Sequence, residues 1–256
     1  MSVSNNDILT SLERGIFSEI EFEINHNCNR ACGYCPNLKY ERMEKGEMAP
    51  ELFEKIMIQL REIGFKGRVS YHFYNEPLLC NNLDKFIRMT GEYLPDSVSY
   101  LYSNGTLLTK KRFVQLTQAG LDKFHITKHE NVGENYVFEK VYNGLPQELK
   151  KLVFYEDFKD VEYSNRGGLL PDIKNEWPEN LPCFIPLRLV TVTLKGNVLP
   201  CYEDFFQVLS MGNVNDEHIL DIWNSNKYRE FRENLRQKGN RNKYDICRNC
   251  NNFKIT

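Results

Sequence analysis

The sequence predicts an α/β protein: a partial (β/α) barrel of about five strands and four helices, followed by a small C-terminal domain. Strand-like runs alternate with helical patterns over residues 19–155, as they do in parallel sheets. One of the runs also alternates between apolar and polar residues, which predicts a sheet with one polar face. A polar inner wall near the carboxyl ends of the strands is typical of barrel active sites.

The five expected strands are residues 19–25, 68–74, 97–103, 123–128 and 151–155. In the second of these, RVSYHFY, successive side chains point to opposite faces. The residues expected to face the helices are Val69, Tyr71 and Phe73. Those expected to face the barrel interior are Ser70, His72 and Tyr74.

The clearest of the four expected helices covers residues 50–64. It has Pro50 in its first turn, an apolar stripe along one side and Gly64 as its stop signal. The other three are expected at residues 81–93, 110–119 and 134–142.

The regular pattern dissolves over residues 156–182, which contain two glycines and three prolines. We place the domain boundary there, between residues 1–165 and 166–256. Beyond it, LVTVTLKGNVLPC predicts a hairpin turning at Gly196, and residues 219–238 predict one or two helices ending at Gly239.

The composition is that of a soluble globular protein, with 41% hydrophobic residues, 27% charged residues and a formal net charge of -2. No signal peptide, membrane span or overall basic character is present, so we expect a cytoplasmic protein that binds neither nucleic acid nor membrane. Eight cysteines in a reducing compartment indicate metal binding or catalysis rather than disulfides.

Three cysteines, Cys28, Cys32 and Cys35, lie on the loop after the first expected strand. Three thiolates can hold three irons of a 4Fe-4S cluster and leave the fourth iron open. An open iron can bind S-adenosylmethionine, whose reductive cleavage gives a 5'-deoxyadenosyl radical. A zinc site is an equally good interpretation of this loop taken alone.

Four more cysteines, Cys183, Cys201, Cys247 and Cys250, form two pairs near the C-terminus. They would close a second metal site completely. Taken alone, they are more typical of a structural zinc ribbon. A zinc-stabilised interaction module without catalysis is therefore the non-enzymatic alternative.

Several motifs in the expected order resemble the radical S-adenosylmethionine superfamily. Tyr34 matches the aromatic position of its C-x3-C-x-Φ-C loop, and YNEPLL matches its glycine-glycine-glutamate-proline motif, with Asn75 replacing the second glycine. YSNG and TKHE follow the third and fourth strands. The resemblance implies that the cofactor-binding residues are Tyr34, Asn75, Glu76, Pro77, Ser103, Asn104, Lys128 and His129.

The C-terminal cysteines resemble the auxiliary-cluster extensions of that superfamily, called SPASM and, in a shorter form, twitch. The seven-cysteine SPASM pattern is not fulfilled, so a twitch domain with one auxiliary 4Fe-4S cluster is implied. The implied cofactors are two 4Fe-4S clusters and S-adenosylmethionine. A fully ligated cluster moves electrons, which indicates an oxidation.

Within the superfamily, the chain resembles twitch dehydrogenases of aminoglycoside antibiotic biosynthesis, including those of butirosin. The segments that match are CNRACGYCPN, YHFYNEPLLC, SNRGG, GNVLPCYEDF and CRNCNN. The implied reaction oxidises a secondary alcohol of an aminocyclitol or sugar, similar to 2-deoxy-scyllo-inosamine, to a ketone. The deoxyadenosyl radical would remove a hydrogen atom, and the auxiliary cluster would take the remaining electron.

The same resemblance implies that four residues face the substrate: Tyr74, Tyr102, Arg166 and Glu203. A substrate with hydroxyls and an ammonium group suits a carboxylate and directed donors. Arg166 is the implied catalytic residue. Its pKa, above about 12, favours stabilisation of alkoxide character over proton acceptance.

Other interpretations remain open from the sequence. Cys80 is by default a buried inert thiol, but a thiol near the barrel mouth could donate a hydrogen atom and make the reaction an epimerisation. Peptide modification is a further alternative. Superfamily members that modify peptides commonly carry an N-terminal peptide-recognition domain, whereas only about eighteen residues precede the first strand here, which favours a small substrate. The basic stretch 227–254 is expected to be a solvated surface or a docking site for a flavodoxin- or ferredoxin-type electron donor. His26, His72, His125 and His218 show no ligand spacing and are expected to be structural or surface residues.

Overall fold

A single eight-stranded sheet organises the computed structural model, which describes residues 15–133, 136–174 and 181–252. The strand order is β5-β4-β3-β2-β1-β6-β7-β8. Strands β1 to β6 run parallel, and β7 and β8 are antiparallel to their neighbours. The strands are β1 Glu19–Phe22, β2 Arg68–Ser70, β3 Val98–Ser103, β4 Lys123–Lys128, β5 Val153–Asp157, β6 Leu189–Val192, β7 Asn197–Leu199 and β8 Gly212–Asn213. The predicted α/β class with a parallel sheet is confirmed.

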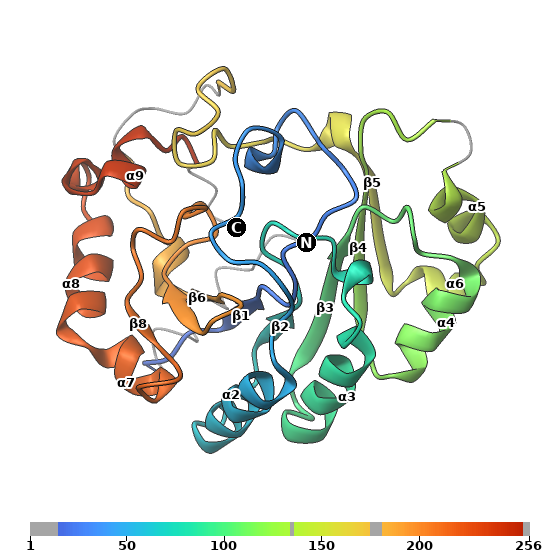
Figure 1. The fold of residues 1–256 in the computed structure, drawn as a ribbon, viewed down its shortest axis with the longest axis horizontal. Coiled ribbons are helices and arrows are strands. Elements are labelled where there is room, and N and C mark those ends of the chain that lie inside the picture. The colour runs from blue at the N-terminus through green and yellow to red at the C-terminus, as the bar shows by residue number, and fades with distance from the viewer. Residues whose placement is uncertain (1–14, 134–135, 175–180, 253–256) are drawn as a thin grey trace.

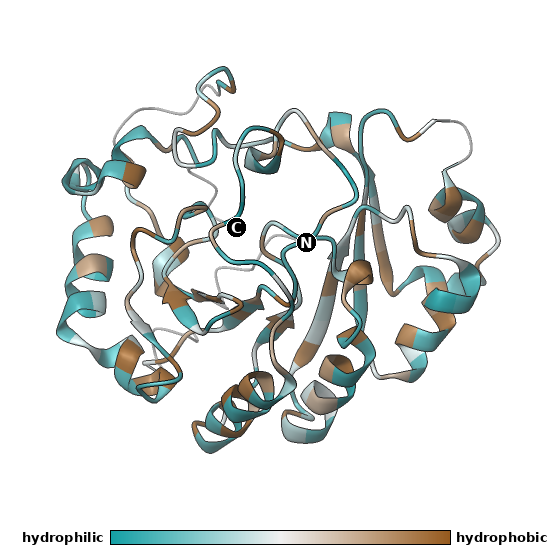
Figure 2. Cartoon of the chain, viewed as in Figure 1, coloured by the Kyte–Doolittle hydropathy of each residue, from teal (hydrophilic) through white to brown (hydrophobic). Residues whose placement is uncertain are grey.

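Helices α2, α3 and α4 lie along the outer side of the barrel strands, and α7 and α8 lie beside the C-terminal strands (Figure 1). The helices are α2 Pro50–Glu62, α3 Leu83–Tyr93, α4 Lys110–Gln118, α5 Val137–Asn143, α6 Gln147–Lys150, α7 Ile219–Asn224, α8 Asn226–Leu235 and α9 Asp245–Asn249. In Figure 2, α2 and α3 each show an apolar side and a polar side. This amphipathic pattern is the one that predicted them.

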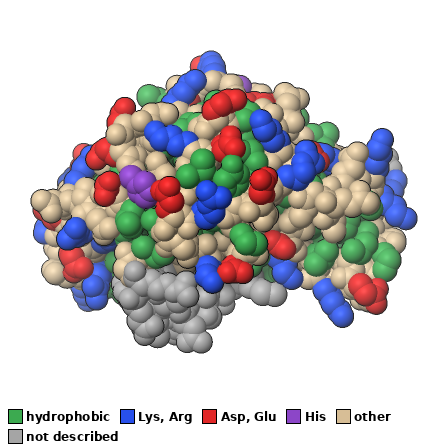
Figure 3. Space-filling view, turned by 90° about the horizontal axis from the view of Figure 1, so that it is seen from below, with side chains coloured by type: hydrophobic (Ala, Val, Ile, Leu, Met, Phe, Trp, Pro, Cys, Tyr) green, Lys and Arg blue, Asp and Glu red, His purple; other side chains and the backbone are tan. Residues whose placement is uncertain are grey.

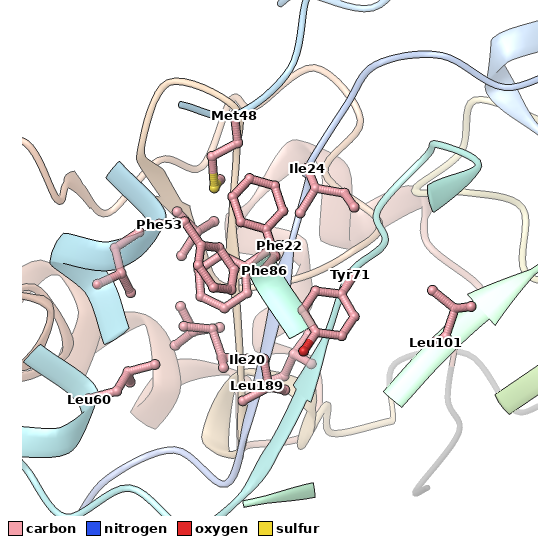
Figure 4. Close-up of a cluster of buried hydrophobic side chains, with 14 of the residues drawn as sticks. Ile20, Phe22, Ile24, Met48, Phe53, Leu60, Tyr71, Phe86, Leu101 and Leu189 are labelled. Carbon is pink, nitrogen blue, oxygen red and sulfur yellow. The ribbon is translucent and has the colours of Figure 1, made fainter. Parts of the chain in front are cut away.

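The main core fills the space between the sheet and these helices (Figure 4). Phe22 of β1 packs against Phe53 of α2, with ring centroids 4.8 Å apart, and Phe53 packs against Phe86 of α3 at 4.4 Å. Burial of each such side chain contributes roughly 1.5–3 kcal/mol to stability. The apolar stripe of residues 50–64 therefore fixes α2 against β1. Strand β1 is the strand that leads into the loop with the first three cysteines.

The other face of the sheet is polar, as predicted. Glu19 and Glu21 of β1 are buried, and Glu19 forms ion pairs with Arg68 and Arg188. His72 Nε2 lies 3.6 Å from Glu21 Oε1. Burial raises the pKa of Glu21 to about 7, although the Arg68 charge acts in the opposite direction. The barrel interior thus contains a network of buried charged side chains on the polar face of the sheet.

The predicted facing of Phe73 is wrong. Strand β2 ends at Ser70, four residues earlier than expected, so the alternation does not continue to residue 74. Asn75 Oδ1 accepts a hydrogen bond from Phe73 N at 2.7 Å and closes a turn there. Phe73 instead joins Tyr74 and Phe205 in a second, smaller apolar cluster.

Other boundaries differ by a few residues. β1 ends at Phe22 rather than residue 25, although Glu23 N still donates to Val192 O at 2.9 Å. β5 begins at Val153 rather than residue 151, because the unpredicted helix α6 and its last turn occupy residues 147–151. Residues 134–135, at the start of the fourth expected helix, lie outside the described residues.

The predicted hairpin forms from β6 and β7, with Gly196 in the turn at a φ of +85°. The sequence did not indicate that β6 also pairs parallel with β1, with Glu19 opposite Leu189. The C-terminal strands therefore extend the barrel sheet. Of the one or two helices expected within residues 219–238, two form, α7 and α8, and α8 ends at Leu235 rather than at Gly239.

The face seen in Figure 3 carries Lys and Arg side chains interspersed with Asp and Glu side chains, in agreement with a net charge near zero. Within the described ranges, none of the helices combines the length and apolarity needed to cross a membrane.

Candidate active site

The loop with the first three cysteines docks on the segment after β4. Gly33 N donates to Glu130 Oε1 at 2.8 Å, and the Arg30 guanidinium donates to the Glu130 carbonyl oxygen. Within the loop, Cys35 N donates to Cys32 O at 3.0 Å. These bonds hold a tight turn at the carboxyl edge of the sheet, where the predicted barrel site was expected.

The three thiols differ in exposure: Cys28 is exposed, Cys32 is buried and Cys35 is half-buried. Burial raises the pKa of Cys35, and the positive charges of Arg166 and Arg42 act against this shift. In the part of the chain that the structure describes, no three His, Cys, Asp or Glu side chains converge on a position for a single metal ion. A 4Fe-4S cluster has no such requirement, since each thiolate ligates a different iron. The donor set fits a cluster.

Glu76 joins the ends of two strands beside this loop. Its carboxylate is 1% exposed and accepts hydrogen bonds from Ser103 Oγ at 2.7 Å, Asn104 N at 2.8 Å and Leu78 N at 3.1 Å. Burial raises the pKa of Glu76 to about 7, and these bonds lower it. A carboxylate has about four acceptor positions, so one remains for a cation. The structure thus brings together three of the residues predicted from separate motifs.

Asn75, which stands where the motif has glycine, ties two loops together. Its Nδ2 lies 2.5 Å from Asn25 Oδ1, and Asn25 Nδ2 donates to the Glu76 carbonyl oxygen at 3.2 Å. Pro77 begins the short 3-10 turn Pro77–Leu79, which the Glu76 side chain caps. The role of Asn25 was missed, because a lone asparagine after a strand carries no motif.

Aromatic rings cover the other side of the loop. Tyr34 stacks on Tyr163 with ring centroids 3.9 Å apart and on His129 at 5.8 Å. The Tyr34 hydroxyl lies 2.5 Å from His129 Nδ1. Lys128 is directed elsewhere, to the carboxylate of Glu139 on α5 at 3.0 and 3.1 Å. Tyr163 was not predicted, since it lies in the segment whose pattern is irregular.

Three of the four expected substrate residues lie together. The Arg166 guanidinium lies 5.8 Å from the Tyr74 ring centroid, and Arg166 Nη1 lies 3.9 Å from Glu203 Oε1. Each has a buried polar atom without a hydrogen-bond partner among the described residues: Tyr74 Oη, Arg166 Nε and Glu203 Oε2. Buried polar groups are normally paired, so three unpaired ones in one place indicate a ligand site.

Tyr102 lies in a different environment. Its ring is 4.1 Å from that of His72 and 4.7 Å from that of His125, inside the polar face of the barrel. No contact among the described residues joins Tyr102 to Arg166 or Glu203. His72 faces Glu21 and His125 faces Glu156 within this polar interior.

The turn that presents Arg166 is held by the C-terminal segment. Asn165 Nδ2 donates to Asn249 O at 2.7 Å, and Asn165 Oδ1 accepts from Gly168 N and Asn251 N, both at 3.1 Å. Gly168 has a φ of +91°, and a Cβ there would lie 2.6 Å from Asn249 Cβ. Arg166 itself has a φ of +52°, a region that non-glycine residues rarely adopt.

The four C-terminal cysteines line one cavity, together with Glu203, Arg241 and Asn252. Backbone N–H groups of Glu203 and Asn252 donate to Cys201 Sγ and Cys250 Sγ, both at 3.3 Å. Burial raises the pKa of all four thiols, that of Cys247 to about 12. A buried set of four sulfurs with N–H donors fits a cluster with four thiolate ligands.

Glu203 connects this cavity to the substrate residues. Its side chain is 1% exposed, and its Oε1 accepts from Ser164 Oγ at 2.7 Å and from Asn252 Nδ2 at 2.6 Å. Its neighbour Asp204 is occupied by the backbone N–H groups of Val208 and Leu209. The structure therefore distinguishes these two adjacent carboxylates, and Glu203, the predicted one, is the one that faces the substrate residues.

Arg42 was also missed. It is buried, forms an ion pair with Glu23 and donates to the Phe205 carbonyl oxygen at 2.9 Å. Its guanidinium lies 5.4 Å from the Tyr74 ring centroid. Arg42 therefore fixes the apolar cluster beside the substrate residues, and no spacing rule links it to Glu23.

Cys80 belongs to the main core on the helix side of the sheet. Its Sγ lies 3.7 Å from Ile24 O and 3.6 Å from Glu47 Oε2, and burial raises its pKa to about 12. This environment matches the interpretation of Cys80 as a buried inert thiol.

Two family models match the chain. Residues 22–130 match the radical SAM superfamily, and residues 183–251 match the SPASM iron-sulfur cluster-binding domain. The S-adenosyl-L-methionine-dependent 2-deoxy-scyllo-inosamine dehydrogenase of Niallia circulans is 47% identical over 240 residues, which are 94% of this chain and 95% of that protein. A GTP 3',8-cyclase of Nautilia profundicola is 31% identical over 153 residues, 56% of this chain and 46% of that enzyme.

Among solved structures, the crystal structure of BtrN in complex with AdoMet and 2-DOIA matches with a TM-score of 0.87 and 47% identity. The match covers 93% of this chain and 94% of that one. The predicted superfamily and the C-terminal auxiliary-cluster extension are confirmed. The chain belongs to the family of radical S-adenosylmethionine proteins that includes the 2-deoxy-scyllo-inosamine dehydrogenase of Niallia circulans.

Proposed function

We propose that this protein is a radical S-adenosylmethionine dehydrogenase that oxidises a secondary alcohol of an aminocyclitol, of the 2-deoxy-scyllo-inosamine type, to a ketone. The proposal rests on the three unpaired buried atoms of Tyr74, Arg166 and Glu203. A hydroxyl, a guanidinium and a carboxylate together suit a molecule that carries hydroxyls and an ammonium group. The 47% identity to a dehydrogenase of that substrate supports it.

The cysteines provide the cofactor sites. Cys28, Cys32 and Cys35 would hold one 4Fe-4S cluster, and Cys183, Cys201, Cys247 and Cys250 would hold a second. When bound, these groups and S-adenosylmethionine supply a radical that removes a hydrogen atom and an acceptor for one electron. We assign the first site to residues 1–165 and the second to residues 166–256, in keeping with the ranges of the two family models.

The residues around the first three cysteines are assigned to S-adenosylmethionine. Glu76, with its remaining acceptor position, binds the methionyl ammonium, and an adjacent cation favours the ionised carboxylate. Asn75 and Pro77 shape the turn that presents Glu76. The remaining contacts are assigned to Tyr34, Ser103, Asn104 and His129, and to Lys128, which has to leave the Glu139 carboxylate to reach the cofactor.

The substrate residues act by binding and by charge. Glu203 accepts the substrate ammonium, and Tyr74 bonds a hydroxyl. Tyr102 is assigned a hydroxyl contact from the barrel interior, apart from the other three residues. Arg166 donates to the reacting hydroxyl oxygen and stabilises the alkoxide character that develops there. The guanidinium remains charged throughout, because its pKa is far above neutral pH.

Two further assignments concern the protein's surroundings. An acidic electron donor of the flavodoxin or ferredoxin type docks on the basic stretch 227–254, of which residues 227–252 are described. We place the reaction in the cytoplasm, where a reducing environment keeps eight thiols available.

The decisive assay is turnover of an aminocyclitol panel by anaerobically purified protein, with products identified by mass and stereochemistry. Ketone formation supports the proposal. A product of inverted stereochemistry carrying one solvent deuterium would instead mean epimerisation. About eight irons and eight sulfides per chain are expected for two 4Fe-4S clusters. One or two zinc ions in a colourless protein would mean an interaction module.

The role of Arg166 has its own test. Arg166→Ala should lower the rate of ketone formation about 10²–10³-fold, as loss of a preorganised donor does, while some cleavage of S-adenosylmethionine persists. Arg166→Lys is the control that keeps the charge without the fork of donors. Full ketone yield from Arg166→Ala would contradict the assignment.

A further inference from the structure

Arg241 is a buried cation in the wall of the four-cysteine cavity. It is 3% exposed, and it lines the cavity together with Cys183, Cys201, Cys247 and Cys250. It lies on the short 3-10 helix Asn240–Lys243. Neither the motifs nor the proposed reaction gives it a role.

Hydrogen bonds to the cysteine segment fix the position of its charge. Arg241 Nη2 donates to the Cys250 carbonyl oxygen, and Nη1 donates to the Asn252 carbonyl oxygen, both at 3.2 Å. The same two residues form the N–H···S contact between Asn252 N and Cys250 Sγ. The guanidinium is therefore held against the chain that supplies two of the four sulfurs, rather than free to turn toward solvent.

The cavity wall has a charge of each sign. Arg241 and Glu203 both line the cavity that the four sulfurs share, and both are buried, at 3% and 1% exposed. Arg241 thus favours additional negative charge on the sulfur set, and Glu203 disfavours it. At low dielectric such interactions are strong and weakly screened.

We propose that Arg241 is a positioning residue that raises the reduction potential of the auxiliary centre and so keeps it an electron acceptor. This inference rests on the proposed function, in which substrate oxidation delivers one electron to that centre. The carbinol carbon loses a hydrogen atom, the hydroxyl loses a proton, and the remaining electron adds one negative charge beside Arg241. A fixed buried cation stabilises the more negative, reduced form.

Arg248 provides a matched control. It lies on α9 between Cys247 and Cys250, but its side chain is 55% exposed and it faces Asp245 at 3.3 Å. Loss of its charge changes the net charge by the same amount as loss of Arg241. Because solvent and salt screen an exposed charge, its loss should have little effect on the centre.

The test is a redox titration followed by electron paramagnetic resonance, in full-length protein carrying Cys28→Ala, Cys32→Ala and Cys35→Ala. Only the auxiliary centre then contributes to the signal. With Arg241→Met, the ratio of reduced to oxidised centre at a fixed potential should fall at least tenfold, which is 59 mV for a one-electron couple. Arg241→Lys and Arg248→Met should each stay within about threefold of the parent.

Iron and sulfide counts separate this inference from the proposed function. If the parent holds no four-iron centre, the proposed function fails and the inference fails with it. If the centre is present and Arg241→Met leaves the potential unchanged, the inference alone is wrong. Arg241→Gln is the second neutral variant. If both neutral variants lose the centre while Arg241→Lys keeps it, Arg241 serves assembly rather than potential, which also overturns the inference.

Discussion

Asn165 offers a sharp test of how the C-terminal segment positions Arg166. Asn165→Ala removes three side-chain hydrogen bonds, to Asn249 O, Gly168 N and Asn251 N. Each buried bond contributes about 1 kcal/mol, so the loss is about 3 kcal/mol. For a chain of this size, that loss lowers the midpoint of thermal unfolding by about 6–12 °C.

The same substitution should affect the reaction more than cofactor cleavage. Arg166 follows Asn165 directly and sits at a φ of +52°, a conformation that the surrounding bonds maintain. With those bonds gone, the guanidinium loses its fixed position. We expect the ratio of ketone to 5'-deoxyadenosine to fall at least tenfold, measured by liquid chromatography and mass spectrometry of single-turnover mixtures.

Asn240→Ala is the control, since its side chain bonds only Gln237 in an exposed position and its loss should change neither quantity. If Asn165→Ala unfolds at the parent temperature and keeps the parent product ratio, the C-terminal segment does not position Arg166. If the unfolding temperature falls but the ratio of ketone to 5'-deoxyadenosine stays unchanged, Asn165 contributes to stability and does not position Arg166.

Three other outcomes are expected. Burial raises the pKa of Glu76 from 4.5 to about 7. Between these two pH values, Glu76 therefore holds a proton in the folded state and loses it in the unfolded state. The free energy of unfolding should therefore fall as pH rises through that window, and Glu76→Gln should flatten this slope in urea titrations of apoprotein. Arg42→Met leaves the Glu23 carboxylate buried without its ion-pair partner. It should lower the free energy of unfolding by about 3–5 kcal/mol and the midpoint of thermal unfolding by about 10 °C. Lys45→Met, which removes an exposed ion pair, should leave both quantities unchanged. Cys201→Ala should lose about four irons per chain, whereas Cys80→Ala should keep all of them together with full ketone yield.

The apolar periodicity, with its glycine and proline signals, was sufficient to predict helices α2, α3 and α4, although not the short α6. The stripe from Pro50 to Gly64 became α2 with little change, because that stripe packs on β1 and the first turn tolerates proline. The strand at residues 123–128 was predicted to the residue. The three-cysteine loop and the Glu76 motif could be predicted because their chemistry requires particular residues at fixed spacing within a short stretch of sequence.

Features that depend on distant residues were not predictable in this way. Three features depend on contacts between segments that are far apart in the sequence. They are the Arg42–Glu23 ion pair, the Asn165 bonds to residues 249–251 and the facing of Phe73. A buried arginine and an exposed one look the same in a sequence. The pairing of β6 with β1 was hidden for the same reason, since a short strand does not specify its neighbour.

The ladder between β1 and β6 also connects the strand that leads to the first three cysteines with the hairpin that leads to Cys201. Cys28 follows β1 and Cys201 follows β7, which is two strand spacings away, about 10 Å. Backbone hydrogen bonds therefore fix the relative position of these two strands. A proline in β6 would break this ladder and should slow electron transfer between the two centres.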